Sequence, residues 1–197
     1  MTSIGQTMKE IESFQSEILK VEYDDDFQFR LVNITTIIYF DYLSHSILYQ
    51  AKNLNLSSIK EAEKYYKLYS QKHLLQEQIR INAVGLFFNL WLEYERFLRR
   101  KLTSIKGEDK FKISSTFNEL LNLIPLEKRG SVENEFEVIR ITRNSLHDGG
   151  IYKLDKPYKG KIGHQTYIFV KNHPVIPIRN LDVVKTIWKH FMILNTL

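Results

Sequence analysis

The segment covering residues 58–102 constrains the fold more than any other part of the chain. It contains no proline and one glycine, Gly85. Ser58 and Glu61 have the spacing of a capping box, which predicts a helix start. Residues 83–92 are apolar on nearly every side, and a helix of that kind belongs in the centre of a bundle. We therefore predict one long helix here, or two helices joined by a kink, in the core of a helical protein.

Helical patterns also occur on both sides of this segment. Residues 27–52 are strongly apolar and lack glycine and proline, so we predict a buried helix, although residues 35–39 favour a strand locally. We place a turn at Arg129-Gly130, with Ser131 as the N-cap of the next helix, and we expect Asn180 to cap the last one. The predicted helices cover residues 3–22, 27–52, 58–102, 115–124, 131–148 and 181–195.

The region after Gly150 has a different pattern. Residues 151–154 and 165–170 are strand-like and enclose the turn-rich stretch 156–163. We therefore predict a single domain over residues 1–197. Its expected fold is all-α, mainly a helical bundle, with a small β-hairpin insertion at about residues 151–171, before the last helix.

Composition narrows the classes of function. The 197 residues include no cysteine, which excludes disulfides, thiolate metal sites and cysteine nucleophiles and fits a reducing cytosol. Histidines and carboxylates show no ligand spacing, so we expect no metal and no cofactor. The sequence has no signal-peptide pattern and no apolar run of membrane-spanning length, so we expect a cytoplasmic protein without a membrane partner. A net charge of +5 permits nucleic-acid binding but is a weak signal alone.

The polar residues Arg140, Arg143, Asn144 and His147 form the candidate catalytic site. On a helical wheel they fall within an arc of about 100°. Arginine offers a planar fork of donors to phosphate oxygens, and histidine exchanges a proton near neutral pH. The alternative is a structural helix end, in which arginine bonds a carboxylate and histidine caps the last carbonyls. These residues alone leave both interpretations open.

Further cations are candidate RNA-binding residues: Arg96, Arg99 and Arg100 at the end of the long helix, and Lys153 and Lys159 on the hairpin. The alternative for the arginines is a solvated helix end, since cations there complement the helix dipole.

Residues 143–150, with the sequence RNSLHDGG, resemble the signature of the HEPN superfamily. These are all-helical proteins, many of them toxin, abortive-infection or CRISPR-associated ribonucleases. Residues 91–98 resemble the end of the family's central helix, and the resemblance spans about residues 60–195. The signature places a polar residue after the arginine and histidine after four to six intervening residues. Arg143 is followed by Asn144, but only three residues separate it from His147. Six residues separate Arg140 from His147, but Ile141 follows Arg140. The signature therefore does not assign the catalytic arginine uniquely. Gly149 occupies the position of the tyrosine that is adenylylated in part of the family.

This resemblance implies a metal-independent endoribonuclease of a bacterial defence or toxin-type system, in which the ribose 2′-hydroxyl attacks the adjacent phosphate. His147 would act as general base or acid, or orient the hydroxyl. Arg143 or Arg140 would stabilise charge on the phosphate, and Asn144 would orient the other groups. The resemblance also implies a homodimer with a composite site, and it leaves any antitoxin or defence partner open. The alternative is a non-catalytic HEPN-like module that binds RNA or nucleotide, or dimerises. The tyrosine-rich residues 65–69 show no base or nucleophile pattern.

Overall fold

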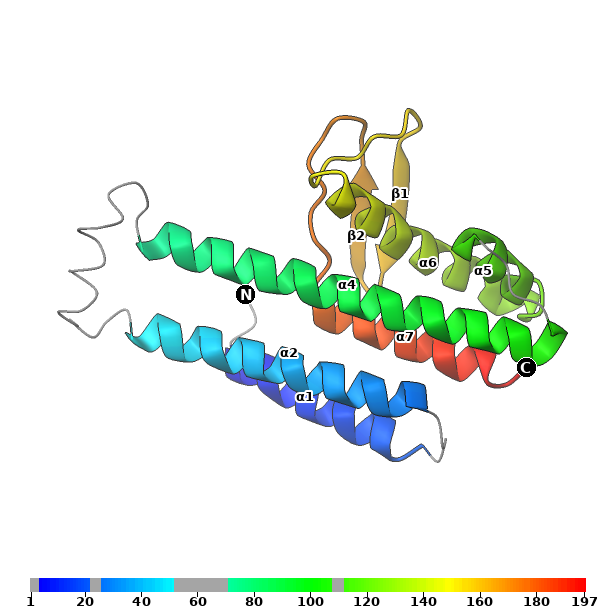
Figure 1. Ribbon diagram of the computed structural model, residues 1–197, viewed down its shortest axis with the longest axis horizontal. Coiled ribbons are helices and arrows are strands. Elements are labelled where there is room, and N and C mark those ends of the chain that lie inside the picture. The colour runs from blue at the N-terminus through cyan, green and yellow to red at the C-terminus, as the bar shows by residue number, and fades with distance from the viewer. Residues whose placement is uncertain (1–3, 22–25, 52–70, 108–111) are drawn as a thin grey trace.

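The computed structural model describes residues 4–21, 26–51, 71–107 and 112–197 (Figure 1). Six helices and one two-stranded antiparallel sheet make up this described part, and the sheet precedes the last helix. The predicted fold class is therefore confirmed. The expected helix start at Ser58 and the tyrosine-rich residues 65–69 lie outside the described residues.

Helices α1 (Ile4–Leu19) and α2 (Asp26–Ala51) pack against each other, and α2 runs alongside α4 (Gln71–Lys106) (Figure 1). The threonines of α2 favour a strand locally, but here they lie in a helix and face α1. Gln15 Nε2 donates to Thr35 Oγ1 at 3.1 Å and to Thr36 Oγ1 at 2.8 Å. The interhelical contacts thus override the local strand preference.

Helix α4 is the central helix that the sequence predicts. Leu90, Tyr94 and Leu98 are fully buried on its inner side. Leu92 is 49% exposed, so the stretch that is apolar on nearly every side still presents one face to solvent. None of the described helices combines the length and apolarity needed to cross a lipid bilayer.

Helices α5 (Ile113–Leu121) and α6 (Leu126–His147) pack through the stacked rings of Phe117 and Phe136, whose centroids are 3.6 Å apart. The predicted turn at Arg129-Gly130 with an N-cap at Ser131 is wrong, because α6 already begins after Pro125. Proline presets the φ angle that a helix start needs. Arg129 Nη2 donates to the carbonyls of Asn122 and Ile124 near the end of α5, at 3.0 and 3.1 Å, which fixes Arg129 within α6.

The hairpin consists of β1 (Tyr158–Ile162) and β2 (Gln165–Phe169). The predicted strand at residues 151–154 is wrong, because only Ile151 forms an isolated bridge there, and β1 lies inside the stretch predicted as a turn. Gly163 has φ +55° and starts a two-residue turn, a geometry that sets hairpin register. At Gly160 an added Cβ would lie 2.3 Å from Val138 Cγ2, so this glycine lets β1 approach α6 closely.

Helix α7 (Asn180–Leu194) packs against α4 and α2 with the predicted inward residues buried: Val184, Ile187, Trp188, Phe191 and Leu194. Asn180 is not the N-cap that the sequence predicts. It is the first helical residue, and its Nδ2 donates to the carbonyl of Ala83 at 3.0 Å. Arg179 occupies the cap position, with its guanidinium bonded to Asp182. The amide of Asn180 is therefore used to tie α7 to α4.

Candidate functional site

The candidate site lies at the C-terminal end of α6, where a double glycine stops the helix as the sequence predicts. Gly149 and Gly150 have φ angles of +78° and +82°, which glycine adopts without strain. The N–H of Gly150 donates to the carbonyl of Ser145 at 2.7 Å, the bond of a Schellman-type helix end. This turn sends the chain back past the last turn of α6.

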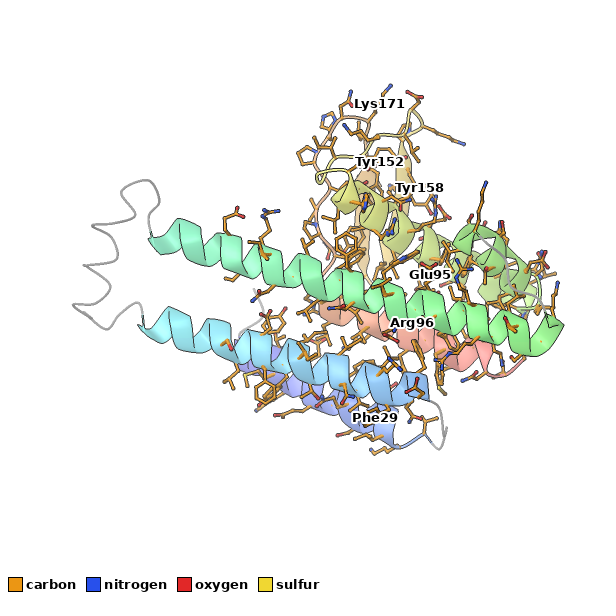
Figure 2. The ribbon with its side chains drawn as sticks, in the orientation of Figure 1. Phe29, Glu95, Arg96, Tyr152, Tyr158 and Lys171 are labelled. Carbon is orange, nitrogen blue, oxygen red and sulfur yellow. The ribbon has the colours of Figure 1, made fainter. Side chains whose placement is uncertain are left out.

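The returning segment, residues 150–154, is held in place by backbone hydrogen bonds. The N–H of Tyr152 donates to His173 O at 3.1 Å, and its carbonyl accepts from the N–H of Asn172 at 2.8 Å. The Tyr152 hydroxyl donates to Lys156 O at 2.6 Å, and its ring lies against Phe169 with centroids 5.7 Å apart. Figure 2 shows Tyr152 and Lys171 in this part of the molecule. The segment therefore forms a fixed wall beside the helix end.

A cleft of about 220 Å³ lies between the end of α6 and this wall, and we call it the α6 cleft. All four residues of the predicted catalytic stripe line it, together with Lys153, a predicted RNA-binding residue. The helix contributes Arg140, Ile141, Arg143, Asn144, Ser145, His147 and Asp148, and the wall contributes Tyr152, Lys153 and Leu154. The structure thus brings the stripe and one hairpin-side cation to a single place.

The two arginines of the cleft have different partners. Arg140 donates from Nε and Nη2 to the two carboxylate oxygens of Glu137, at 2.9 and 2.7 Å. These hydrogen bonds raise the pKa of the Arg140 guanidinium. Arg143 donates from Nη1 to Asn144 Oδ1 at 3.1 Å, and its Nε is buried without a hydrogen-bond partner. Within the described part of the chain Arg143 has no carboxylate partner, so its charge is available to a ligand.

His147 is exposed and loosely held. Its side chain is 70% exposed, and its nearest carboxylate contact is 3.8 Å, from Nδ1 to Asp148 Oδ1, which is beyond hydrogen-bond distance. The carbonyls of Asn144 and Ser145 are bonded to the N–H groups of Asp148 and Gly150 instead. The alternative of a purely structural helix end therefore fits Arg140, which bonds a carboxylate. It does not fit His147, because the carbonyls that His147 would cap are bonded to backbone N–H groups.

The charge of the α6 cleft favours an anion. Arg140, Arg143 and Lys153 line it against one lining carboxylate, Asp148, and Glu137 pairs with Arg140. The end of a helix carries partial negative charge, so attraction for an anion has to come from these side chains. In the part of the chain that the structure describes, three or more His, Asp or Glu residues nowhere gather in a way that could hold a metal ion.

The remaining predicted RNA-binding residues do not join the α6 cleft. The three arginines of α4 each contact a carboxylate: Arg96 to Glu93 at 2.6 Å, Arg99 to Glu95 at 2.9 Å and Arg100 to Asp26 at 3.5 Å. Figure 2 places Arg96 well apart from Tyr152. Lys159 lines a separate cleft.

The sequence does not predict Glu137, Tyr152 or Leu154 as residues of the α6 cleft region. Glu137 stands three residues before Arg140, a helical spacing that signals an ion pair in the sequence. Tyr152 and Leu154 carry no such signal, because their positions depend on how the chain returns after Gly150.

A scan against protein-family models, a search of curated proteins and a search of solved structures found no match to this chain.

Proposed function

We propose that the protein is a metal-independent endoribonuclease of the kind that the HEPN-like signature suggests, acting in a bacterial defence or toxin-type system. The α6 cleft is its active site. The observation that carries the proposal is the pairing of Arg143, whose guanidinium has no carboxylate partner among the described residues, with the exposed His147 in one cleft.

The cleft supports binding of one RNA phosphate. Arg143 presents a planar fork of donors that matches phosphate oxygens, and Lys153 adds a second positive charge. Asn144 Oδ1 accepts from Arg143 Nη1 and so orients the fork. Among the two rivals we assign the phosphate role to Arg143, because Arg140 is held by Glu137 through two hydrogen bonds.

The proposed reaction is an internal transfer at phosphorus. The ribose 2′-oxygen attacks the adjacent phosphorus, and the bond from phosphorus to the 5′-oxygen breaks. The products are a 2′,3′-cyclic phosphate and a 5′-hydroxyl. His147 accepts the proton of the 2′-hydroxyl or donates one to the 5′-oxygen. Arg143 stabilises the charge that develops on the phosphate oxygens.

The α6 cleft of one protomer contains one histidine, whereas the reaction uses a general base and a general acid. A second copy related by a two-fold axis would bring its own α6 end and so a second imidazole. The proposal therefore includes a homodimer with a composite site. The same observation also favours a second candidate, a non-catalytic RNA- or nucleotide-binding module, because one imidazole on its own supplies half of the required proton transfers.

Digestion of a labelled single-stranded RNA in EDTA tests the proposal. The wild type should cleave it and leave cyclic phosphate ends, and His147→Ala should cleave about 10²- to 10⁴-fold more slowly. His164→Ala, in the exposed hairpin turn, is the matched control and should retain activity. Equal cleavage by wild type and His147→Ala would overturn the proposal. Binding of the RNA without cleavage would support the non-catalytic module instead.

A further inference from the structure

The outer sides of α2 and α4 together form an exposed apolar surface, and we call it the α2–α4 face. Three contacts hold the two helices in an antiparallel register: Arg100 to Asp26 and Arg30 to Glu93, both at 3.5 Å, and Asn82 Nδ2 to Asp41 Oδ1 at 3.1 Å. Large apolar side chains that are 49% to 65% exposed lie along both helices in this region: Phe29, Ile37 and Phe40 on α2, and Ile81 and Leu92 on α4.

The α2–α4 face points away from the rest of the bundle. Phe27 of α2 and Phe97 of α4 both lie against Phe191 of α7, with ring centroids 5.3 and 5.1 Å from it. A helix advances about 100° per residue, so Phe29 lies about 160° around α2 from Phe27. Leu92 lies about 140° around α4 from Phe97 by the same geometry. The exposed apolar residues are therefore on the side of the two helices opposite to α7.

The size of the α2–α4 face suits a protein partner. Its apolar residues span about 17 Å along each helix, and two packed helices are together about 20 Å wide. Monomeric proteins rarely expose apolar patches larger than a few hundred Å², and such patches mark interaction sites. With the charged residues around it, the face approaches the roughly 600 Å² per partner of a small specific interface.

The arginines that border one end of the face are bonded within the chain. Arg30 Nε donates to Asp26 at 2.8 Å. Arg96 Nη1 donates to Glu93 at 2.6 Å, and Arg100 contacts Asp26. Nucleic acid is bound mainly through cations that contact phosphates, and these cations already have carboxylate partners. The face therefore favours an apolar partner over a nucleic acid.

Two asparagines, Asn33 and Asn89, lie near the middle of the α2–α4 face, between the contact of Asn82 with Asp41 and that of Arg100 with Asp26. Both are exposed, and neither side chain has a hydrogen-bond partner among the described residues. An amide both donates and accepts, so it can pair with an amide of an identical chain across a two-fold axis. An asparagine within an apolar seam fixes the register of paired helices in this way. A second copy thus offers an apolar surface together with partners for both amides.

We propose that the α2–α4 face is the surface through which two copies of this chain associate. The contact is isologous, so the apolar residues of one copy pack against those of the other and the charged residues form the rim. The inference rests on the proposed function in one respect, because it names the surface of the homodimer that the composite site requires. The association itself is independent of cleavage and is measured without RNA.

Sedimentation velocity of the full chain over a range of concentrations tests the association. The chain has a mass of 23.4 kDa, and the wild type should approach twice that mass as its concentration is raised. The double variant Ile37→Asp with Leu92→Asp brings like charges together in the contact and should weaken dimerisation at least about tenfold. Because both side chains are exposed in the single chain, the variant should keep the helical circular dichroism of the wild type.

The matched control is Leu19→Asp with Leu126→Asp. These leucines of α1 and α6 are at least as exposed as Ile37 and Leu92, but they lie outside the α2–α4 face. The control should dimerise as the wild type does.

The absence of cysteine from the chain allows the surface to be located by cross-linking. Asn33→Cys and Asn89→Cys each introduce a single thiol near the middle of the face. A short bismaleimide should join two copies of these variants. It should not join two copies of Leu19→Cys, whose thiol is on α1.

The proposal is overturned if the wild type keeps the mass of one chain at every concentration, or if Ile37→Asp with Leu92→Asp associates as the wild type does. It is also overturned if the control variant is weakened as much, or if neither asparagine variant is cross-linked. His147→Ala should associate normally. A chain that associates through this face but cleaves no RNA would contradict the nuclease proposal alone, whereas cleavage by a chain that stays monomeric would contradict this inference and the composite site.

Discussion

Two polar clusters, one beside the first half of α6 and one at its C-terminal end, differ in how many of their polar groups are hydrogen-bonded. Beside its first half, His190 is 0% exposed, with Nδ1 bonded to Tyr94 Oη and Nε2 to Glu135. At its end, the side chain of His147 is 70% exposed, and none of the described carboxylates lies within hydrogen-bond distance of it. One histidine has both ring nitrogens bonded, and the other lies in an open cleft.

This difference indicates that the buried cluster stabilises the fold, whereas the exposed groups at the end of α6 are available for function. A buried polar group has to be hydrogen-bonded, because leaving it unpaired costs free energy of folding. The cluster of Tyr94, His190 and Glu135 meets that requirement and joins α4, α7 and α6. An exposed group is under no such requirement and is available to a ligand. We therefore expect substitutions in the buried cluster to affect folding, and substitutions at the end of α6 to affect chemistry.

The largest expected effect on stability is that of His190→Ala. It leaves the Tyr94 hydroxyl and one bond of Glu135 without a partner and opens a cavity in the core. We expect the free energy of unfolding to fall by about 3 kcal/mol. Urea denaturation followed by circular dichroism measures it.

The matched variant is His147→Ala. Because His147 is exposed and loosely held, its replacement should change the free energy of unfolding by less than about 0.5 kcal/mol. A loss of similar size in both variants would contradict the distinction between the two clusters.

The two arginines of the α6 cleft allow the same comparison, between a bonded and an available group, within the proposed active site. Arg143→Gln should lower the rate of RNA cleavage about 10²-fold, because it removes a donor that no carboxylate of the described residues occupies. Arg140→Gln should lower it less than about fivefold, since the Arg140 guanidinium is bonded to Glu137. Single-turnover cleavage of the same labelled RNA gives both rates.

A larger loss in Arg140→Gln would reverse this assignment. It would show that the six-residue spacing to His147 identifies the functional arginine. It would also imply that Glu137 releases Arg140 when RNA binds.

The helical part of the fold is predictable because it depends on local periodicity. The apolar positions of α7 recur at helical spacing, and that helix buries the expected residues. The apolar stretch of α4 predicts a central helix, although its Leu92 is 49% exposed. The start of α6 was missed because it depends on Arg129 bonding carbonyls near the end of α5, a contact between elements. The sequence does not predict the position of β1, because Gly160 and Gly163 are typical of a loop. One allows close packing against α6 and the other forms a tight turn.

In the candidate site, too, local spacing predicts some features, and others depend on contacts between elements. Arg140, Arg143 and His147 share one cleft because helix geometry alone places them on one side. The wall containing Tyr152 follows from hydrogen bonds between residues 150–152 and 172–175, which no local pattern signals. The contact between Arg100 and Asp26 likewise joins α4 to α2, and sequence spacing does not reveal it.

The smallest expected effect is the pH dependence that the buried cluster adds to stability. Burial lowers the pKa of His190 below its usual value of 6.5. The hydrogen bonds from His190 and Lys189 hold the pKa of Glu135 below its usual 4.5, although burial alone would raise it. For both groups the unfolded chain binds a proton at a higher pH than the folded chain does. Their contribution to stability is therefore complete above the unfolded pKa and is lost as pH falls toward the folded value.

We expect the free energy of unfolding to decrease as pH is lowered below 6.5, by at most about 1.4 kcal/mol per pH unit for His190. Urea denaturation at a series of pH values from 7.5 to about 5 measures the slope. His190→Gln removes this titration while keeping a side chain that donates and accepts hydrogen bonds, so its slope over that interval should be smaller than that of the wild type. A further decrease at lower pH, to which the lowered pKa values of Glu10, Asp26 and Glu135 contribute, lies outside this interval. Equal slopes for wild type and His190→Gln would show that His190 titrates alike in the folded and unfolded chain, and the buried cluster would then lose its distinction from the open end of α6.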